Sequence, residues 1–215
     1  MAQTFQAGEE SPSSEDEGGF PEALPIGIEA LSGTFPFTSK NLPKSHSLEL
    51  LEQHLPSYDR AWYLANSYLG HASYFFRPIK REELLDTLLP NLYNTANQRI
   101  RTRINLNASS EDSPRSNESS CVEPDLNDCH ALAMGFFLFA LGALFDVNLP
   151  PYNAEAEKYY DLGRGALSAK AVYHSPSIDT VQAVGLMATY HTLAGKKYSR
   201  DSAVSHVQAV QEISQ

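Results

Sequence analysis

Residues 131–145 read ALAMGFFLFALGALF, and this uninterrupted run of apolar and small side chains decides which folds are open to the chain. Its 15 residues fall short of the about 18 to 20 that a helix needs to cross a bilayer. Asp128 and Asp146 lie just outside the run on either side. We therefore expect a helix that is buried on all sides in the core of a folded domain, and no membrane span.

The sequence before this run predicts further helices. Ser57 is a candidate N-cap, and apolar residues follow it at alternating spacings of four and three, namely Tyr58, Trp62, Ala65, Leu69, Ala72 and Phe76. Such spacing is typical of one buried helix face. Pro78 should end this helix, and another should cover residues 81–89. Pro90 should kink or end that second helix before a short helix at 93–104.

The sequence after the run predicts helices as well. Asn153 is a candidate N-cap, because Glu155 and Glu157 follow it where carboxylates favour a helix start. Ser175 with Pro176 should begin the next helix, and Ser199 a last one that reaches residue 215. No run of β-branched residues bounded by turn signals occurs. The predicted fold is all-α, an irregular helical bundle.

The net charge of −10 is concentrated in two segments. Residues 1–45 hold seven acidic and two basic residues, and residues 105–130 hold six acidic and one basic. Both segments are rich in Ser, Pro, Gly or Glu and lack periodic apolar residues, a composition typical of disorder. We expect a disordered acidic segment at 1–45 and a partial all-α domain at 46–215 with a disordered insertion at 105–125.

Catalytic, metal and nucleic-acid motifs are not evident. Asp128, Cys129 and His130 are consecutive, so on a helix they cannot all face one ion. Gly163-Arg-Gly165 lacks the strand and the third glycine of a phosphate loop, and close helix packing explains it better. The cluster Arg99, Arg101 and Arg103 suits a helix end. We expect no enzyme, no bound metal, no cofactor and no direct DNA binding.

Three serines are candidate phosphorylation sites. Ser13 and Ser14 lie in SSEDE, and Ser109 lies in SSED, a pattern that acid-directed kinases prefer. A phosphate there would add charge to segments that are already acidic. A simple solvated linker is the competing interpretation.

The region 46–203 resembles the middle homology region of fungal zinc-cluster transcription factors. The resemblance is sharpest between residues 138 and 201. It rests on pieces that follow one another in one order, namely FALGALFD at 139–146, PYN at 151–153, EKYY at 157–160, LS at 167–168 and PSIDTVQA at 176–183. In this family the region is an all-α regulatory domain that lies downstream of a six-cysteine, two-zinc DNA-binding cluster.

The resemblance implies a regulatory, protein-interaction region of a nuclear factor that controls RNA polymerase II transcription. Expected partners are the transcription machinery, co-regulators or a second copy of the chain. With two cysteines, Cys121 and Cys129, the sequence holds no zinc cluster. In this family DNA is bound through the zinc cluster, so we expect no DNA binding by this chain alone. Family members continue from the SRDSA segment at 199–203 into apolar helices, whereas VSHVQAVQEISQ stays polar, so we expect a C-terminally truncated domain whose last helix leaves an apolar surface uncovered.

An alternative function is the sensing of a small molecule, such as an inducer. Polar-tipped aromatic side chains on otherwise apolar helix faces could supply contacts in a pocket. The candidates are Tyr159, Tyr160, Tyr190 and His191. For His191, a hydrogen-bonded core residue is the competing interpretation.

Overall fold

The computed structural model describes residues 25–35, 44–108, 127–150, 153–170, 172–173 and 176–194. Every regular element in these ranges is helical, which confirms the all-α fold. The elements are α1 (Ile26–Thr34), α2 (Lys44–Glu52), α3 (Tyr58–Ser67), η1 (Tyr68–Ala72), η2 (Glu83–Leu88), α4 (Leu89–Ala108), α5 (Asn127–Leu144), α6 (Ala154–Ala169) and α7 (Ile178–Leu193). The elements η1 and η2 are π-helical.

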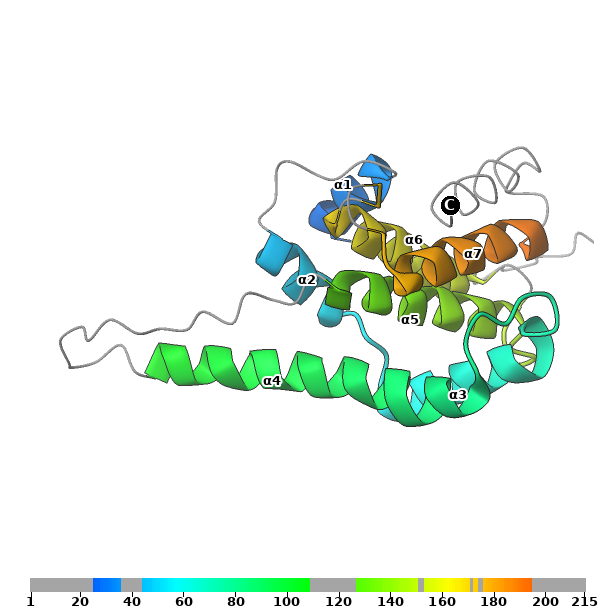
Figure 1. Cartoon of the computed structure of the whole chain (residues 1–215), viewed down its shortest axis with the longest axis horizontal. Helices are drawn as coiled ribbons and strands as arrows, with labels where there is room; N and C mark the ends of the chain where they lie inside the picture. The colour runs from blue at the N-terminus through cyan, green and yellow to red at the C-terminus, as the bar shows by residue number, and fades with distance from the viewer. Residues whose placement is uncertain are drawn as a thin grey trace, which may run out of the picture.

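Helix α5 is the centre of the bundle. It packs against α6 and α7 on one side and against α3 on the other, while α1 covers α6 (Figure 1). Residues 132–143 are buried on all sides, as the apolar run predicts. Phe136 and Phe139 lie against Tyr159 of α6, and Phe137 lies against Tyr160. No helix in the described ranges is both long and apolar enough to span a membrane.

The predicted cap of α6 is confirmed, and that of α7 lies two residues further on. Asn153 Oδ1 accepts a hydrogen bond from the Ala156 amide at 2.8 Å, and Asn153 Nδ2 donates to the Ala143 carbonyl at 2.8 Å. One side chain thus starts α6 and closes the end of α5. Helix α7 is capped by Ser177, not Ser175, because Ser177 and Thr180 form a reciprocal capping box.

The helix does not end at Pro90, so of the two predicted outcomes, a kink or an end, the second is wrong. The chain passes from η2 into α4 without interruption, and the Leu89 amide donates to the Leu84 carbonyl five residues back. The wider π-helical turn lets the backbone pass a residue that has no amide hydrogen and needs room for its ring. Helix α4 therefore starts at Leu89 and continues to Ala108, past the expected end at 104.

The predicted boundaries of the disordered segments are wrong in three places. Residues 26–34 and 44–45 are helical, and α4 covers 105–108. Ile28 and Leu31 of α1 are almost fully buried, and α1 packs on α6. The short apolar stretch at 26–31 becomes a helix through this tertiary contact, which composition does not reveal. Residues 1–24, 36–43 and 109–125 and the helix expected from Ser199 lie outside the described residues.

The buried face of α3 differs from the predicted stripe. Ala61, Leu64 and Ala65 are fully buried, whereas Tyr58 and Trp62 are 43% and 41% exposed. The backbone of α3 comes close to α5 at Leu64 and Gly142, and the Tyr58 ring lies instead against Tyr93 of α4. Gly163 of α6 makes a similar close approach, since a Cβ atom there would lie 2.7 Å from the Phe137 ring. The packing explanation for this glycine is confirmed.

Candidate functional site

The outer half of α4 projects from the bundle (Figure 1). Four apolar residues follow one another along this helix at steps of four, so each lies beside the next on the helix surface and the row turns by about 40° at each step. Leu92 and Ala96 are buried at 8% and 7% exposure, while Ile100 and Ile104 are 55% and 60% exposed. We call Leu92, Ala96, Ile100 and Ile104 the α4 stripe. The row of apolar side chains therefore winds from the core onto the exposed part of the helix, where Ile100 and Ile104 are neighbours.

Two ion pairs hold the projecting half of α4 against α2. Arg99 pairs with Glu52, and Arg103 Nη1 lies 3.1 Å from Glu49 Oε2. The sequence predicts that these arginines lie at a helix end. They do not lie in the last turn, because α4 continues to Ala108. The ion pairs fix how the helix is rotated, and so fix the direction in which Ile100 and Ile104 point.

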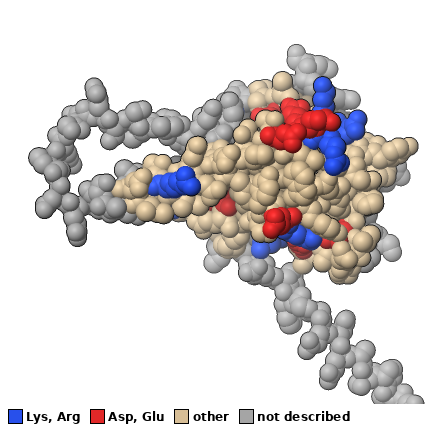
Figure 2. Space-filling view, turned by 90° about the horizontal axis from the view of Figure 1, so that it is seen from below, with Lys and Arg blue, Asp and Glu red and all other residues tan. Residues whose placement is uncertain are grey.

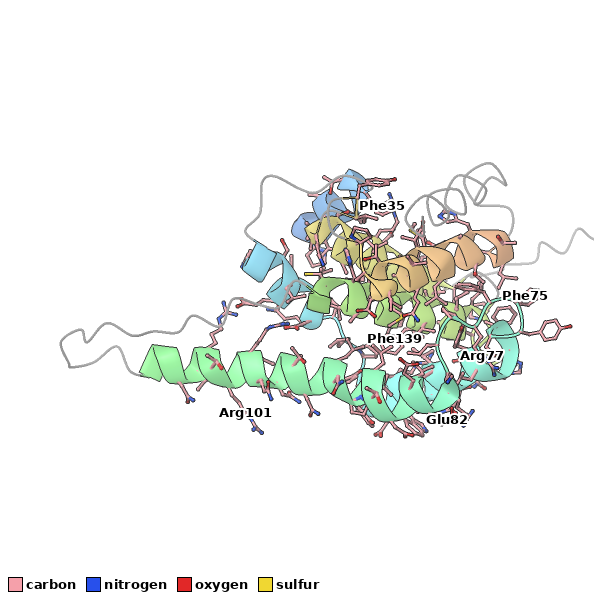
Figure 3. All side chains as sticks on the ribbon, in the orientation of Figure 1. Phe35, Phe75, Arg77, Glu82, Arg101 and Phe139 are labelled. Carbon is pink, nitrogen blue, oxygen red and sulfur yellow. The ribbon has the colours of Figure 1, made fainter. Side chains whose placement is uncertain are left out.

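The basic residues of this region do not gather into one surface. Arg101 points away from the body of the molecule (Figure 3). On the face seen from below, Lys and Arg side chains appear in separate places, and those on the broad part of the molecule lie beside Asp and Glu side chains (Figure 2). A surface that tracks nucleic-acid phosphates needs clustered cations. The exposed half of α4 is instead an apolar stripe beside arginines that are largely engaged by glutamates.

Three of the four residues predicted to contact a ligand meet between α6 and α7. The Tyr160 and Tyr190 rings stack with centroids 4.7 Å apart, and the Tyr160 hydroxyl lies 2.5 Å from His191 Nε2. All three side chains are buried. His191 thus has the hydrogen-bonded core position that was the competing interpretation. A ligand role for this cluster stays a prediction.

Tyr159 lies elsewhere, on the face of α6 that packs on α5. Its ring contacts Phe136 and Phe139, and its hydroxyl donates to Glu155 Oε1 at 3.3 Å. Burial raises the pKa of Tyr159 well above its ordinary value, and the nearby Glu155 carboxylate adds to the effect. The candidate phosphorylation sites Ser13, Ser14 and Ser109 lie outside the described residues.

A polar cluster that sequence reasoning missed ties α3 to α5 and α6. Arg60 donates to Glu155 through Nε and Nη2, at 3.1 and 2.5 Å, and to Asp146 Oδ2 at 2.9 Å. Tyr63 and Asn148 donate to the other oxygen of Asp146. Burial favours the protonated form of Asp146, but the hydrogen bonds from Asn148, Arg60 and Tyr63 outweigh it and lower the pKa of this carboxyl.

A second buried network joins the starts of α5 and α7. His130 is fully buried. Its Nδ1 lies 2.6 Å from Thr180 Oγ1, and its Nε2 lies 3.4 Å from the Lys170 carbonyl. A carbonyl can only accept, so Nε2 carries the hydrogen and Nδ1 accepts from Thr180. Burial lowers the pKa of His130 to about 4, although the Lys170 carbonyl acts in the opposite direction.

His130 should make the protein sensitive to mild acid. The unfolded chain protonates this histidine near pH 6.5, whereas the folded protein does so only near pH 4. The contribution of neutral His130 to the free energy of unfolding should therefore be complete above about pH 6.5. The free energy of unfolding should fall by up to about 1.4 kcal/mol per pH unit as the pH drops toward 4. Urea unfolding at pH 7, 6, 5 and 4 measures this slope. His130→Asn should flatten the slope, and equal slopes in the two proteins would contradict the assignment.

The described residues hold no group of three or more His, Cys, Asp or Glu side chains that could bind a metal ion. Arg60, Asp146 and Glu155 were not predicted to meet because 86 and 95 residues separate Arg60 from its two partners. A comparison with protein-family models, with curated proteins and with solved structures finds no match to this chain.

Proposed function

We propose that this chain is the regulatory, protein-interaction region of a fungal zinc-cluster transcription factor. In this proposal it acts in the nucleus on RNA polymerase II transcription and does not bind DNA by itself. The sequence resemblance supplies the family, and one structural observation supports the interaction role. That observation is the α4 stripe, a row of apolar side chains that runs from the core into solvent, where Ile100 and Ile104 are exposed.

The exposed half of the stripe is suited to a protein partner. Full burial of an isoleucine side chain stabilises a complex by about 1.5 to 3 kcal/mol, so covering two half-exposed ones supplies a useful anchor. The 20 residues of α4 span about 30 Å, which gives a partner helix room to lie alongside. Because Arg99 and Arg103 are already paired with glutamates, the surface favours an apolar contact over a phosphate backbone.

The sensing of a small molecule is the second candidate function. A cavity of about 250 Å³ between α4, α5 and α7 supports it. Tyr159, Tyr160, Tyr190 and His191 do not line this cavity. If the chain binds a ligand there, the residues that do so differ from those that the sequence suggested.

Two measurements test the proposed function. The chain fused to an unrelated DNA-binding domain should change the output of a reporter gene in yeast, compared with that DNA-binding domain alone. The chain by itself should not shift a library of DNA duplexes at low salt, where electrostatic binding is strongest. Unchanged reporter output, or tight sequence-specific binding of a duplex by the isolated chain, would contradict the proposal.

A further inference from the structure

A cavity of about 250 Å³ lies where η2 and the start of α4 face the starts of α5 and α7. Thr87, Asn91 and Thr95 form one wall at steps of four residues, so the wall is about 12 Å long. The apolar part of the lining consists of Ile79, Leu88, Leu92, Ala131, Leu132 and Met134. The cavity is therefore elongated and has an apolar floor.

One end of the cavity carries two carboxylates. Asp179 lies in the first turn of α7 and is partly buried, and Glu83 faces the same space from η2. Burial raises the pKa of Asp179, and the charge of Glu83 raises it further, while the charge of Lys170 acts more weakly in the opposite direction. Within the described residues neither carboxylate forms a hydrogen bond or an ion pair with a protein group.

At the other end of the cavity, the one carboxylate of the lining already has a cationic partner. Glu52 lines that end and is ion-paired with Arg99 of α4. The lining includes no lysine or arginine that could reach the carboxylates at the opposite end. Gln182, beside Asp179, donates its amide hydrogen to the Pro78 carbonyl at 2.8 Å. The cavity thus offers an apolar trough with negative charge at one end.

We propose that this cavity binds a small amine with a hydrocarbon body. The ammonium group pairs with Glu83 and Asp179, which both line the cavity. The hydrocarbon part covers Leu88, Leu92 and Leu132. A volume of about 250 Å³ has room for a short hydrocarbon chain. This site rests on the cavity of the second candidate function and names its ligand class, and it does not depend on the proposed role in transcription.

The test compares three probes with the same six-carbon tail, namely hexylamine, hexan-1-ol and hexanoate. Binding to the full chain is measured by NMR titration at pH 7, where Glu83 and Asp179 can pair with the ammonium. Hexylamine should bind at least about tenfold more tightly than hexan-1-ol, because charge-assisted hydrogen bonds add to the same apolar contact. Hexanoate should not bind. Equal affinities for amine and alcohol, or no saturable binding of hexylamine, would overturn the proposal.

Variants identify the site. Glu83→Gln/Asp179→Asn should weaken hexylamine binding at least about tenfold and leave hexan-1-ol binding unchanged. The control Glu29→Gln/Asp59→Asn removes the same charge from two exposed positions outside the cavity and should bind hexylamine like the original chain. If the double variant folds poorly, the single variant Glu83→Gln is used instead, because Glu83 is exposed. It should lose part of the affinity for hexylamine. Equal hexylamine binding by all variants would refute the site.

The amine could also belong to a lysine of a partner protein. Nα-acetyl-lysine amide carries the same ammonium on a shorter hydrocarbon stem, with peptide groups attached. We expect it to bind more weakly than hexylamine, because its polar amides would have to lie on the apolar floor. Tighter binding of the lysine derivative would overturn the assignment to a free small amine.

Discussion

Replacing Arg60 by methionine should lower the free energy of unfolding by about 3 kcal/mol. The substitution keeps most of the side-chain length but removes the group that neutralises Asp146 and Glu155. The Asp146 side chain is 1% exposed, so its charge would remain in the interior without a cation. Breaking a buried ion pair in this way costs about 3 to 5 kcal/mol, and we take the lower value because Arg60 is 30% exposed.

The change at Arg60 is measured by urea unfolding at pH 7, with Arg81→Met as the control. Arg81 donates to Asn66 at an exposed position, and its replacement should change stability by less than about 0.5 kcal/mol. In a double-mutant cycle, Asp146→Asn should reduce the cost of Arg60→Met, because the uncompensated charge is gone. If Arg60→Met lowered the free energy of unfolding equally in the original chain and in the Asp146→Asn variant, the account would be contradicted.

The same pair predicts a dependence on pH. The pKa of Asp146 is lower in the folded protein than in the unfolded chain, so its contribution is complete above the unfolded value of about 3.9. The contribution is lost as pH falls through the folded value. The stability difference between the original chain and Arg60→Met should therefore shrink when the pH is lowered below about 4.

Replacing Gly142 by alanine should also cost about 3 kcal/mol. A Cβ atom at this position would lie 2.2 Å from the Leu64 carbonyl oxygen and 2.8 Å from its carbon. These are backbone atoms of α3, so no side chain can rotate away and the two helices must separate. The Ser67 hydroxyl, which donates to the Gly142 carbonyl at 2.8 Å, would be displaced as well. Overpacking usually costs about 1 to 3 kcal/mol, and a rigid clash places this case at the upper limit.

The matched control for Gly142 is Gly33→Ala in α1. Nothing lies within 4 Å of a Cβ atom at Gly33, so alanine should leave stability unchanged or raise it by about 0.4 to 1 kcal/mol. Thermal and urea unfolding of the two variants distinguish the clash from the general effect of a glycine replacement. If both variants had the same stability, the close crossing of α3 and α5 would be refuted.

The sequence predicted the elements that are determined by residues close to one another in the chain. The composition of the apolar run at 131–145 predicts a buried helix. Asn153 is predicted as an N-cap from its residue type and from the residues that follow it. Residues 26–31 were different, because their helix depends on contact with α6, which is more than 120 residues away in the chain. The helix end predicted at Pro90 was wrong because the preceding residues adopt a π-helical turn that sequence patterns do not encode.

The candidate sites follow the same division. The arginines of α4 were recognised as a cluster, but their glutamate partners on α2 could not be identified from the sequence. The exposure of Ile100 and Ile104 depends on α4 extending beyond the bundle, and the sequence predicted a shorter helix. Glu83 and Asp179 meet across a cavity from helices almost 100 residues apart, so only the fold reveals their proximity.

The α4 stripe can be tested directly by comparing two double variants in the reporter fusion. Ile100→Glu/Ile104→Glu adds two charges to the stripe, and Asn94→Glu/Gln98→Glu adds two charges to exposed positions about 120° around the same helix. Both should unfold within about 0.5 kcal/mol of the original chain, because all four side chains are exposed. The account predicts that the stripe variant loses the effect on the reporter and that the Asn94/Gln98 variant keeps it. An undiminished effect of the stripe variant would contradict the central claim that this chain regulates transcription through the exposed stripe of α4.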